Sequence, residues 1–368
     1  MGRAATATIN FDAIRANYRL AKSLSNGQKA VAIIKADAYG HGAPVVANAL
    51  AAEADAFGVA CIEEALELRE AGIKNPILLL EGFFTADELP LIAQHNLWTS
   101  VHSLSQIEDI KNAKLKNSIN VWLKMDTGMH RLGIAPEDYM GAYTALKSLP
   151  QVKEVVLMSH FSSSDNLSVD TTNEQINCFN TFSASIDAPV SLANSAGTLG
   201  HADARREWQR PGIMLYGATP FEQSHPQGDL LRSAMTLSSE VIAIHHLQPG
   251  EGVGYSRTFV CDKPTVVGTV AMGYADGYPR HAKNGTPILV NGQLTRTIGR
   301  VSMDMLAVDL TDLENVEVGA YVECWGENLP AAQVAPHCDT IPYTLFTGIT
   351  RRVHKKYCDD RQVLKQVS

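Results

Sequence analysis

Short apolar runs alternate with amphipathic stretches along the first part of the chain, from residue 30 to about residue 220. Each run is mostly continuous in its apolar residues, as in strands that are covered on both faces. The runs are VAIIKA (31–36), AFGVA (56–60), PILLLEG (76–82), LWTSVH (97–102), NVWLKMDTG (120–128), EVVLMSHF (154–161), VSLANS (190–195) and GIMLYG (212–217). Eight parallel strands close a (β/α)8 barrel, so the pattern predicts a TIM-type barrel.

The segments between these runs carry the signals of helices. The stretch that begins at Thr85 has Glu88 three residues later, which is the capping-box pattern of a helix start. Pro136 stands near the start of another stretch, in the first turn, where a helix tolerates proline. Helices are predicted at residues 62–72, 85–96, 135–149 and 173–186.

The pattern changes after residue 230, where strand-like runs are separated by Gly, Pro and Asn turns. The Asn291–Gly292 pair between two apolar runs is a strong hairpin signal. The runs cover residues 239–247, 264–274, 286–299, 303–310 and 320–326, and helical stretches follow at 328–337 and 341–353. We therefore expect a barrel domain over residues 1–230 and a mostly-β domain over residues 231–368. The first few residues are candidates to join the second domain.

The composition limits the class of protein further. The chain has 368 residues with 45% hydrophobic and 19% charged residues, and its net charge of −8 argues against a nucleic-acid-binding surface. Its six cysteines lie far apart and form no CxxC pair, which is typical of reduced thiols. We find no secretory signal and no run near the roughly 20 apolar residues of a membrane span. We expect a cytoplasmic protein without a membrane or nucleic-acid partner.

The ends of the predicted barrel strands carry the chemistry, as expected for this fold. Lysine, arginine, histidine, serine and asparagine side chains follow these strands: Lys35, Lys124, Arg131, His160, Asn194, Ser195 and Arg210. The set is cationic and rich in hydrogen-bond donors, which suits a phosphorylated anionic ligand. It lacks the grouped carboxylates and histidines of a hydrolytic metal centre, so we expect no metal.

Lys35 is the most unusual of these residues, because it follows directly on a buried apolar strand. A buried ammonium is costly, so such a lysine is either paired or used as an uncharged amine. Taken alone, a lysine at this position is more often a side chain that reaches from a strand end to solvent.

A series of motifs in fixed order resembles the alanine racemases, which are pyridoxal-phosphate enzymes built as a barrel plus a β-domain. The motifs are VAIIKADAYGHG, LKMDTGMHRLG, SHFSSSD, ANSAG, RPGIMLYG, VGYSRTF, MGYADGYPR and GRVSMDM. The resemblance extends from residue 31 to about residue 357. It implies pyridoxal 5′-phosphate (PLP) as cofactor and a homodimer as the assembly.

The resemblance also implies roles for single residues. Lys35 binds the pyridoxal aldehyde and serves one face of the substrate, while Tyr255 reaches in from the partner subunit and serves the other. His160 is the neighbour of Tyr255, and Arg210 faces the pyridine nitrogen. Local sequence alone leaves Tyr255 as a packing aromatic and Arg210 as a surface residue.

Further residues are implied for the phosphate, the substrate and the pocket. Loops after the seventh and eighth barrel strands commonly bind phosphate, and here they contain Asn194, Ser195, Gly212 and Ile213. The resemblance adds Tyr39 and Tyr343 on the phosphate, Arg131 and Met303 on the substrate carboxylate, and Tyr274 at the entrance. It also implies a possible carbamate on Lys124 beside Arg131.

The function that follows is a two-base racemase that interconverts L- and D-alanine, either supplying D-alanine for peptidoglycan or degrading alanine. Open alternatives are a broad-specificity amino-acid racemase, a decarboxylase on the same scaffold and a non-catalytic PLP-binding barrel. A barrel hydrolase with metals on a carbamylated Lys124 is a further option, but its ligands are lacking.

Overall fold

The computed structural model describes residues 2–360, so the last eight residues of the expected β-domain lie outside the described part. The chain forms two compact units. The barrel unit comprises residues 15–215 and 219–231, and the β unit comprises the residues up to 14, 216–218 and those from 232 onward.

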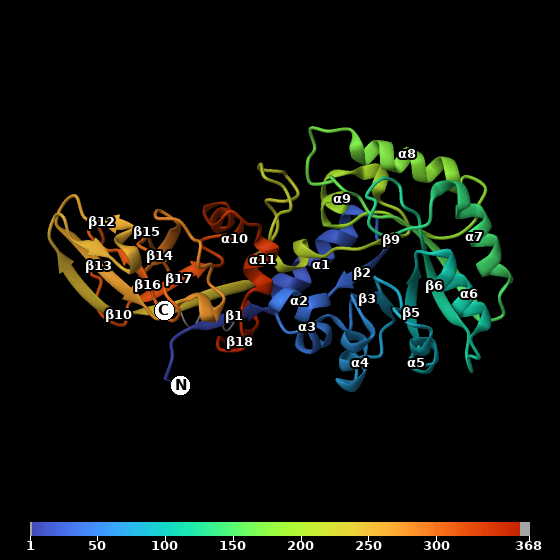
Figure 1. The fold of residues 1–368 in the computed structure, drawn as a ribbon, viewed down its shortest axis with the longest axis horizontal. Coiled ribbons are helices and arrows are strands. Elements are labelled where there is room, and N and C mark those ends of the chain that lie inside the picture. Colours follow the sequence, from blue (N-terminus) through green and yellow to red (C-terminus); the bar gives the residue numbers. More distant parts are fainter. Residues whose placement is uncertain (1, 361–368) are drawn as a thin grey trace. The chain divides into compact units, whose positions relative to one another are not determined.

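Eight parallel strands form the barrel unit, as predicted (Figure 1). They are β2 (Lys29–Ile33), β3 (Ala56–Val59), β4 (Ile77–Leu79), β5 (Leu97–Val101), β6 (Ile119–Lys124), β7 (Val152–Met158), β8 (Val190–Ser191) and β9 (Trp208–Gln209). The order is β8-β7-β6-β5-β4-β3-β2-β9. Hydrogen bonds beyond the ladders join its two ends, from the Arg210 N–H to the Ala193 carbonyl (2.9 Å) and from Ser191 Oγ to the Trp208 carbonyl (2.9 Å). The result is a nearly closed TIM-type barrel.

The predicted position of the eighth strand is wrong. Residues 212–217 contain a 3-10 turn (Ile213–Tyr216), and the strand that pairs with β2 is the two-residue β9 just before it. Pro211 has no backbone N–H to donate to a neighbouring strand. The pairing of β9 with β2 therefore ends before the apolar run begins. Residues Ile213–Tyr216 are buried instead, and Met214 packs against α1 and α9.

Helices surround the strands, and the four predicted ones are present as α4 (Ile62–Glu70), α5 (Leu89–Gln94) after a 3-10 turn, α7 (Pro136–Ser148) and α8 (Thr171–Ser183). The capping box is confirmed, because Glu88 Oε1 accepts from the Thr85 N–H at 3.0 Å. Sequence reasoning did not list α1 (Phe11–Leu24), α2 (Lys35–Gly40), α3 (Ala43–Leu50), α6 (Leu104–Asn112) and α9 (Ser195–Gly200). Within residues 2–360 we find no helix that is long and apolar enough to cross a membrane.

Three tryptophans from different strands pack together on the inward face of the barrel. The rings of Trp98 and Trp122 are stacked with centroids 6.0 Å apart, and Trp208 meets both edge-on at 5.5 and 5.6 Å. Because side chains alternate along a strand, Ser100 on β5 and Lys124 on β6 share this face with Trp98 and Trp122. The tryptophans thus fill the interior on the N-terminal side and leave the C-terminal side to polar groups.

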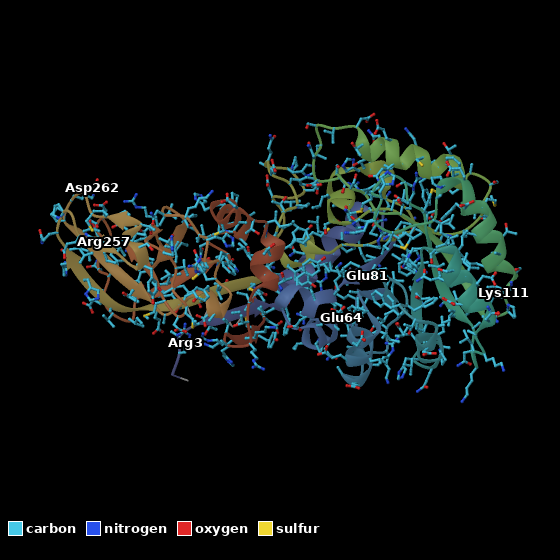
Figure 2. The ribbon with its side chains drawn as sticks, viewed as in Figure 1. Arg3, Glu64, Glu81, Lys111, Arg257 and Asp262 are labelled. Carbon is cyan, nitrogen blue, oxygen red and sulfur yellow. The ribbon has the colours of Figure 1, made fainter. Side chains whose placement is uncertain are left out.

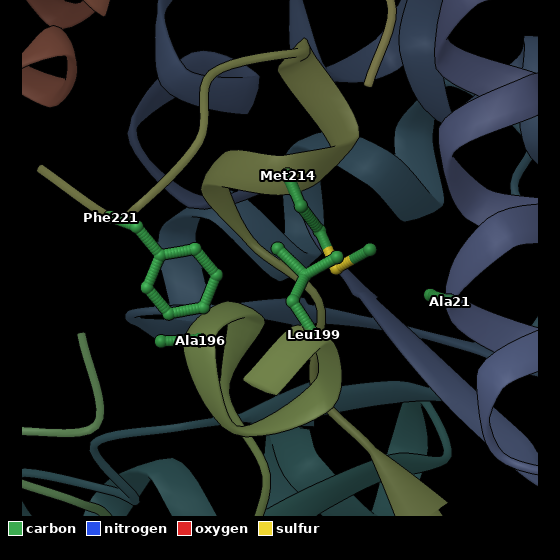
Figure 3. Packing of buried hydrophobic residues seen from close by; sticks show 5 residues of the cluster. All are labelled: Ala21, Ala196, Leu199, Met214 and Phe221. Atoms are coloured by element: carbon green, nitrogen blue, oxygen red, sulfur yellow. The ribbon is translucent and has the colours of Figure 1, made fainter. Parts of the chain in front are cut away.

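A second cluster fixes the short helix α9 against α1 (Figure 3). Ala196 and Leu199 of α9 pack with Ala21 of α1, Met214 and Phe221, and all five are buried. This packing positions the start of α9, where two candidate site residues lie.

The β unit contains an eight-stranded sheet of order β13-β16-β15-β14-β17-β10-β1-β18. Its strands are β1 (Thr6–Asn10), β10 (Met235–Leu247), β13 (Thr265–Val270), β14 (Pro287–Val290), β15 (Gln293–Ile298), β16 (Leu306–Asp309), β17 (Tyr321–Trp325) and β18 (His354–Cys358). The predicted hairpin is confirmed, with positive φ at Asn291 (47°) and Gly292 (76°) between β14 and β15. A small hairpin, β11 (Gly252–Val253) and β12 (Phe259–Val260), and the helices α10 (Ala331–Val334) and α11 (Pro342–Thr347) complete the unit.

Candidate active site

The C-terminal ends of the barrel strands collect the predicted polar residues of the barrel unit. Each of them follows, or is the last residue of, a strand whose neighbours run parallel to it, so their side chains belong to one mouth of the barrel. They are Lys35 and Tyr39 after β2, Lys124 and Arg131 at β6, His160 after β7, Asn194 and Ser195 after β8, and Arg210, Gly212 and Ile213 after β9.

Lys35 opens a turn with unusual backbone geometry. The next four residues, Ala36 to Tyr39, all have left-handed φ and ψ angles, with φ between 51° and 54°. None of them is glycine, and each left-handed residue with a side chain costs about 1–2 kcal/mol. Strain of this kind persists where the surroundings determine the backbone, and it is concentrated at functional sites.

Hydrogen bonds from outside the turn hold this strained backbone. The Ala36 N–H donates to Glu64 Oε1 at 2.7 Å, and the Ala43 N–H donates to Asp37 Oδ1 at 2.8 Å. The Ala38 N–H donates to the Ile34 carbonyl at 2.9 Å. The turn therefore fixes the direction in which the Lys35 and Tyr39 side chains leave the barrel rim.

Tyr39 and Gly212 approach each other closely. A β-carbon on Gly212 would lie 2.8 Å from the Tyr39 hydroxyl oxygen, so a side chain at residue 212 would displace the Tyr39 phenol. The Gly212 N–H donates to Ser195 Oγ at 2.8 Å, and the Met214 N–H approaches the same oxygen at 3.3 Å. A phenol, a hydroxyl and backbone N–H groups thus lie together at the rim.

Asn194 precedes Ser195 and caps the helix that Ser195 begins. Its Oδ1 accepts from the Gly197 N–H at 2.9 Å, which makes Asn194 the N-cap of α9, and also from Ser164 Oγ at 3.0 Å. The Asn194 side chain therefore holds the start of α9, whose first residue is Ser195.

Arg210 is buried and held on neutral oxygens. Its guanidinium donates to the Ser191 carbonyl (2.8 Å), Ser191 Oγ (2.5 Å), the Ser159 carbonyl (2.6 Å) and the Leu192 carbonyl (3.2 Å). Burial lowers the pKa of Arg210 to about 10, so it stays charged at neutral pH. The fork is rigid, and it cannot accept a proton from a ligand.

Lys124 and His160 show the electrostatic effect of this crowded mouth. Burial, and then the charges of Arg210, Arg131 and Lys35, lower the pKa of Lys124 to about 8. Burial, followed by Arg210 and Lys124, holds the pKa of His160 well below its usual value. At neutral pH His160 is therefore uncharged, and about a tenth of Lys124 is a free amine.

Arg131 belongs to a loop that Asp126 shapes. The Asp126 carboxylate accepts from the Gly128 and His130 N–H groups at 3.0 Å each. A β-carbon on Gly133 would lie 2.4 Å from the Asp126 backbone nitrogen, so the loop closes only with glycine there. These constraints give the exposed Arg131 a defined backbone position beside β6.

The remaining predicted residues belong to the β unit. Tyr255 begins a 3-10 turn and is 69% exposed, and Met303 is 52% exposed in a loop before β16. The loops of Tyr274 and Met303 are joined by the N–H of Ala275, which donates to the Met303 carbonyl at 2.9 Å. Tyr343 lies in α11.

Three residues near Lys124 were missed by sequence reasoning: Glu81, His102 and Gln106. The Glu81 charge raises the pKa of Lys124, opposing the surrounding cations, and Figure 2 labels its side chain. His102 follows β5 and interacts with the charge of Lys124. The signal that identifies them is strand register, which requires knowledge of which strands pair.

Within the described residues, no group of three or more His, Cys, Asp or Glu side chains could hold a metal ion. The site is instead a cluster of cations and neutral donors. A TIM-type barrel with an amine-bearing mouth and a β unit of this topology defines a class of two-domain enzyme.

Comparison with known proteins identifies the family within this class. Residues 9–220 match the model of the alanine racemase N-terminal domain, and residues 234–357 match that of the C-terminal domain. A catabolic alanine racemase of Pseudomonas putida is 55% identical over 96% of this chain and 99% of the relative. The chain belongs to the alanine racemase family.

Solved structures agree with this assignment. The biosynthetic alanine racemase of Pseudomonas aeruginosa superposes with a TM-score of 0.94 at 44% identity, over 97% of this chain and 99% of that one. The alanine racemase of Bartonella henselae, described with covalently bound pyridoxal phosphate, has a TM-score of 0.87 at 32% identity, over 96% of this chain and 99% of that one.

Proposed function

We propose that this protein interconverts L- and D-alanine with PLP bound covalently to Lys35. The single observation that carries the proposal is the barrel mouth itself. There Glu64 holds the turn that Lys35 opens, Gly212 donates to Ser195, Ser191 holds Arg210, and the charges of Lys35 and Arg210 both act on Lys124. When bound, PLP supplies an electron-withdrawing ring that makes the α-proton of the substrate acidic.

The residues fit this cofactor in charge and shape. The cationic side chains of Lys35, Arg131 and Arg210 suit an anionic phosphorylated ligand. The Tyr39 hydroxyl, Ser195 and the backbone of Gly212 and Ile213 would hold the phosphate, in a space that a β-carbon at residue 212 would fill. Tyr343 is a further proposed phosphate donor.

Arg210 would face the ring nitrogen of the cofactor. A buried guanidinium that is already bonded to four neutral oxygens keeps its proton, so it donates to that nitrogen and leaves it unprotonated. This weakens the cofactor's ability to stabilise negative charge and favours rapid return of the proton.

Two acid/base groups are needed, because inversion requires the proton to return on the opposite face. Lys35 serves one face, and the partner subunit's Tyr255 serves the other, so the enzyme is a homodimer. Tyr255 is exposed in its own chain and adjoins a hollow of about 290 Å³ whose lining includes Gly254, Ser302 and Met305. In the proposed dimer the partner subunit would cover Tyr255 and Met303, which would explain why these large apolar side chains are exposed in the single chain.

Arg131 and the backbone N–H of Met303 would bind the substrate carboxylate, and Tyr274 would narrow the entrance. An extra methylene in a tight pocket costs about 1–3 kcal/mol, which favours alanine over larger amino acids. A broad-specificity racemase would show comparable turnover of larger substrates.

Lys124 would carry a carbamate. Its lowered pKa leaves free amine at neutral pH, and a negative carbamate would replace repulsion of Arg131 with attraction. Intact mass measured under carbon dioxide and again after acidification should show one additional CO₂ that disappears. A bare amine under both conditions contradicts the carbamate.

We further propose that residues 1–230 act as the cofactor-binding domain and residues 231–368 as the domain of the second base. A cytoplasmic location is supported by six free cysteines. The role is either D-alanine supply for peptidoglycan or alanine breakdown.

The decisive experiment combines labelling with chiral analysis. Borohydride treatment of the purified protein should attach the cofactor to Lys35, as found by peptide mass spectrometry. Incubation of D-alanine in heavy water should yield both enantiomers with deuterium at the α-carbon. Labelling without racemisation would leave a non-catalytic PLP-binding barrel, and the absence of labelling would overturn the cofactor assignment.

A further inference from the structure

His102 lies beside Lys124 on the neighbouring barrel strand. Val101 of β5 pairs with Leu123 of β6, so His102 and Lys124, the next residues along, stand at the same level. Neighbouring strands are about 4.8 Å apart, and side chains at matching positions point to the same face. That face is the barrel interior, because Ser100 Oγ, two residues before His102, contacts Met158 Sδ at 3.5 Å.

Gln106 in the first turn of α6 determines how the His102 ring is held. The backbone N–H of His102 donates to Gln106 Oε1 at 2.9 Å, which fixes which end of the amide is oxygen. The amide nitrogen of Gln106 therefore points the other way. It donates to the Phe83 carbonyl at 3.0 Å and faces His102 Nε2 at 3.4 Å. Gln106 is only 6% exposed, whereas the His102 ring is half-buried.

The Gln106 amide has consequences for the imidazole. Two N–H groups cannot donate to each other, so His102 Nε2 must present its lone pair to Gln106. The proton of the neutral ring is then on Nδ1, and the main chains of Glu81 and of His102 itself, both of which raise the pKa of the ring, are the acceptors we infer for it. Burial and the charge of Lys124 also lower the pKa of His102.

The turn after β4 fits closely against this arrangement. A β-carbon on Gly82 would lie 2.5 Å from the Ser100 carbonyl oxygen and 3.1 Å from Gln106 Nε2, and its φ is 79°. The glycine lets Glu81 and Phe83 present their carbonyl groups to His102 and Gln106. The half-buried ring thus borders segments from two strand ends and one helix.

We propose that His102 is a positioning residue for Lys124: Gln106 fixes its imidazole in the neutral form, and this uncharged ring shields the Lys124 amine from water and keeps it free. The groups that face Lys124 are Lys35, Glu81, His102, Arg131, His160 and Arg210. Burial contributes most to the lowered pKa of Lys124, so a residue that excludes water there has a direct effect.

The last step of this inference rests on the proposed carbamate. The nitrogen of the free amine bonds to the carbon of CO₂, and one nitrogen-bound proton leaves to solvent, which yields an anionic carbamate. Only the uncharged amine has the lone pair for this bond. Water beside Lys124 would favour the ammonium and so reduce the carbamate.

The first test measures the tautomer of His102 in the purified full-length protein. Nitrogen-15 NMR of the neutral imidazole should show a proton on Nδ1 only, and the ring should titrate below the ordinary midpoint of 6.5. In Gln106→Leu the Nε2–H form should become detectable. A neutral wild-type ring that carries its proton on Nε2, or that titrates at or above 6.5, contradicts the proposal.

The second test measures the pH dependence of the Lys124 amine by trace acetylation in CO₂-free buffer, with the exposed Lys111 as internal reference. His102→Ala should raise the Lys124 midpoint by about one pH unit, which is a tenfold loss of free amine at neutral pH. His102→Gln, which is neutral and polar, should shift it less. Glu81→Gln should lower the midpoint, because Glu81 raises that pKa.

These readouts do not depend on racemase activity. An unchanged Lys124 midpoint in a folded His102→Ala protein overturns the shielding role, whatever the reaction of the enzyme. If His102→Ala does not fold, the other two variants still test the proposal. His102→Gln should raise the Lys124 midpoint and Glu81→Gln should lower it, so equal shifts in the same direction would contradict the shielding role. NMR with carbon-13 bicarbonate then measures carbamate occupancy, which should fall with the free-amine fraction.

Discussion

The Tyr39 hydroxyl oxygen lies 2.8 Å from the point that a β-carbon of residue 212 would occupy, so Gly212 leaves room at the rim for the phenol and a ligand. Gly212→Ala should displace Tyr39 and weaken cofactor binding at least tenfold, because about 1.4 kcal/mol is a tenfold change. Fluorescence titration of the apoprotein with PLP measures this. Gly141→Ala is the matched control, since a β-carbon on Gly141 meets nothing within 4 Å. Equal affinity of both variants would remove Gly212 from the phosphate site.

Ser191 supports Arg210 through both its carbonyl and its hydroxyl oxygen. Ser191→Ala removes one hydrogen bond to a buried charge, which should destabilise the protein by about 1.5–3 kcal/mol. Arg210→Lys should lower kcat more than Ser191→Ala does, because an ammonium cannot reproduce the four-point contact of the fork. Steady-state kinetics and urea unfolding of both variants provide the comparison. A fully active Arg210→Lys enzyme would show that charge alone suffices.

Tyr255→Phe removes the hydroxyl of a tyrosine that is 69% exposed in its own chain. If the partner's Tyr255 is the second base, deuterium exchange from the L-alanine side should fall at least a hundredfold while PLP absorbance is retained. Tyr321→Phe is the control, because Tyr321 is another half-exposed tyrosine of the β unit. Unchanged exchange in both directions would exclude Tyr255 from proton transfer.

His160 should make the protein sensitive to acid. Its pKa in the folded state lies well below the ordinary value near 6.5, first because of burial and then because of Arg210. The unfolded chain therefore binds more protons below about pH 6.5, and stability is lost as the pH falls through that range. Urea unfolding between pH 7.5 and 5.5 should show a smaller loss for His160→Gln than for wild type, by about 1 kcal/mol at one unit below 6.5. His354→Gln, an exposed change, should behave as wild type.

The strand ends could be predicted from sequence because they combine two simple signals. Apolar runs such as Val31–Ile34 identify buried strands, and a lysine placed directly after one is costly without a function. The eighth strand was misplaced because β9 has only two residues and its ladder with β2 depends on Trp208 and Gln209, which form no apolar run. Register gave the remaining information: His102 becomes a neighbour of Lys124 only once β5 and β6 are known to pair.

The turn after Lys35 could not be predicted, because Ala36, Asp37 and Ala38 are ordinary residues that rarely adopt positive φ. Its conformation follows from the tertiary hydrogen bonds of Glu64 and Asp37. Ala36 is exposed with φ 51°, so Ala36→Gly removes a steric cost and should leave stability unchanged or raise it by up to about 1 kcal/mol. Ala36→Val adds a branched β-carbon there and should destabilise the protein.

An alanine-to-glycine change in a regular helix should instead lower the stability of the protein. Ala145→Gly, at an exposed position of α7, should cost about 1 kcal/mol, since glycine is disfavoured in a helix interior. Thermal and urea unfolding of the three variants should therefore give the stability order Ala36→Gly, then Ala145→Gly, then Ala36→Val. If Ala36→Gly loses as much stability as Ala145→Gly, the left-handed turn carries no strain, and Lys35 is positioned by an ordinary loop.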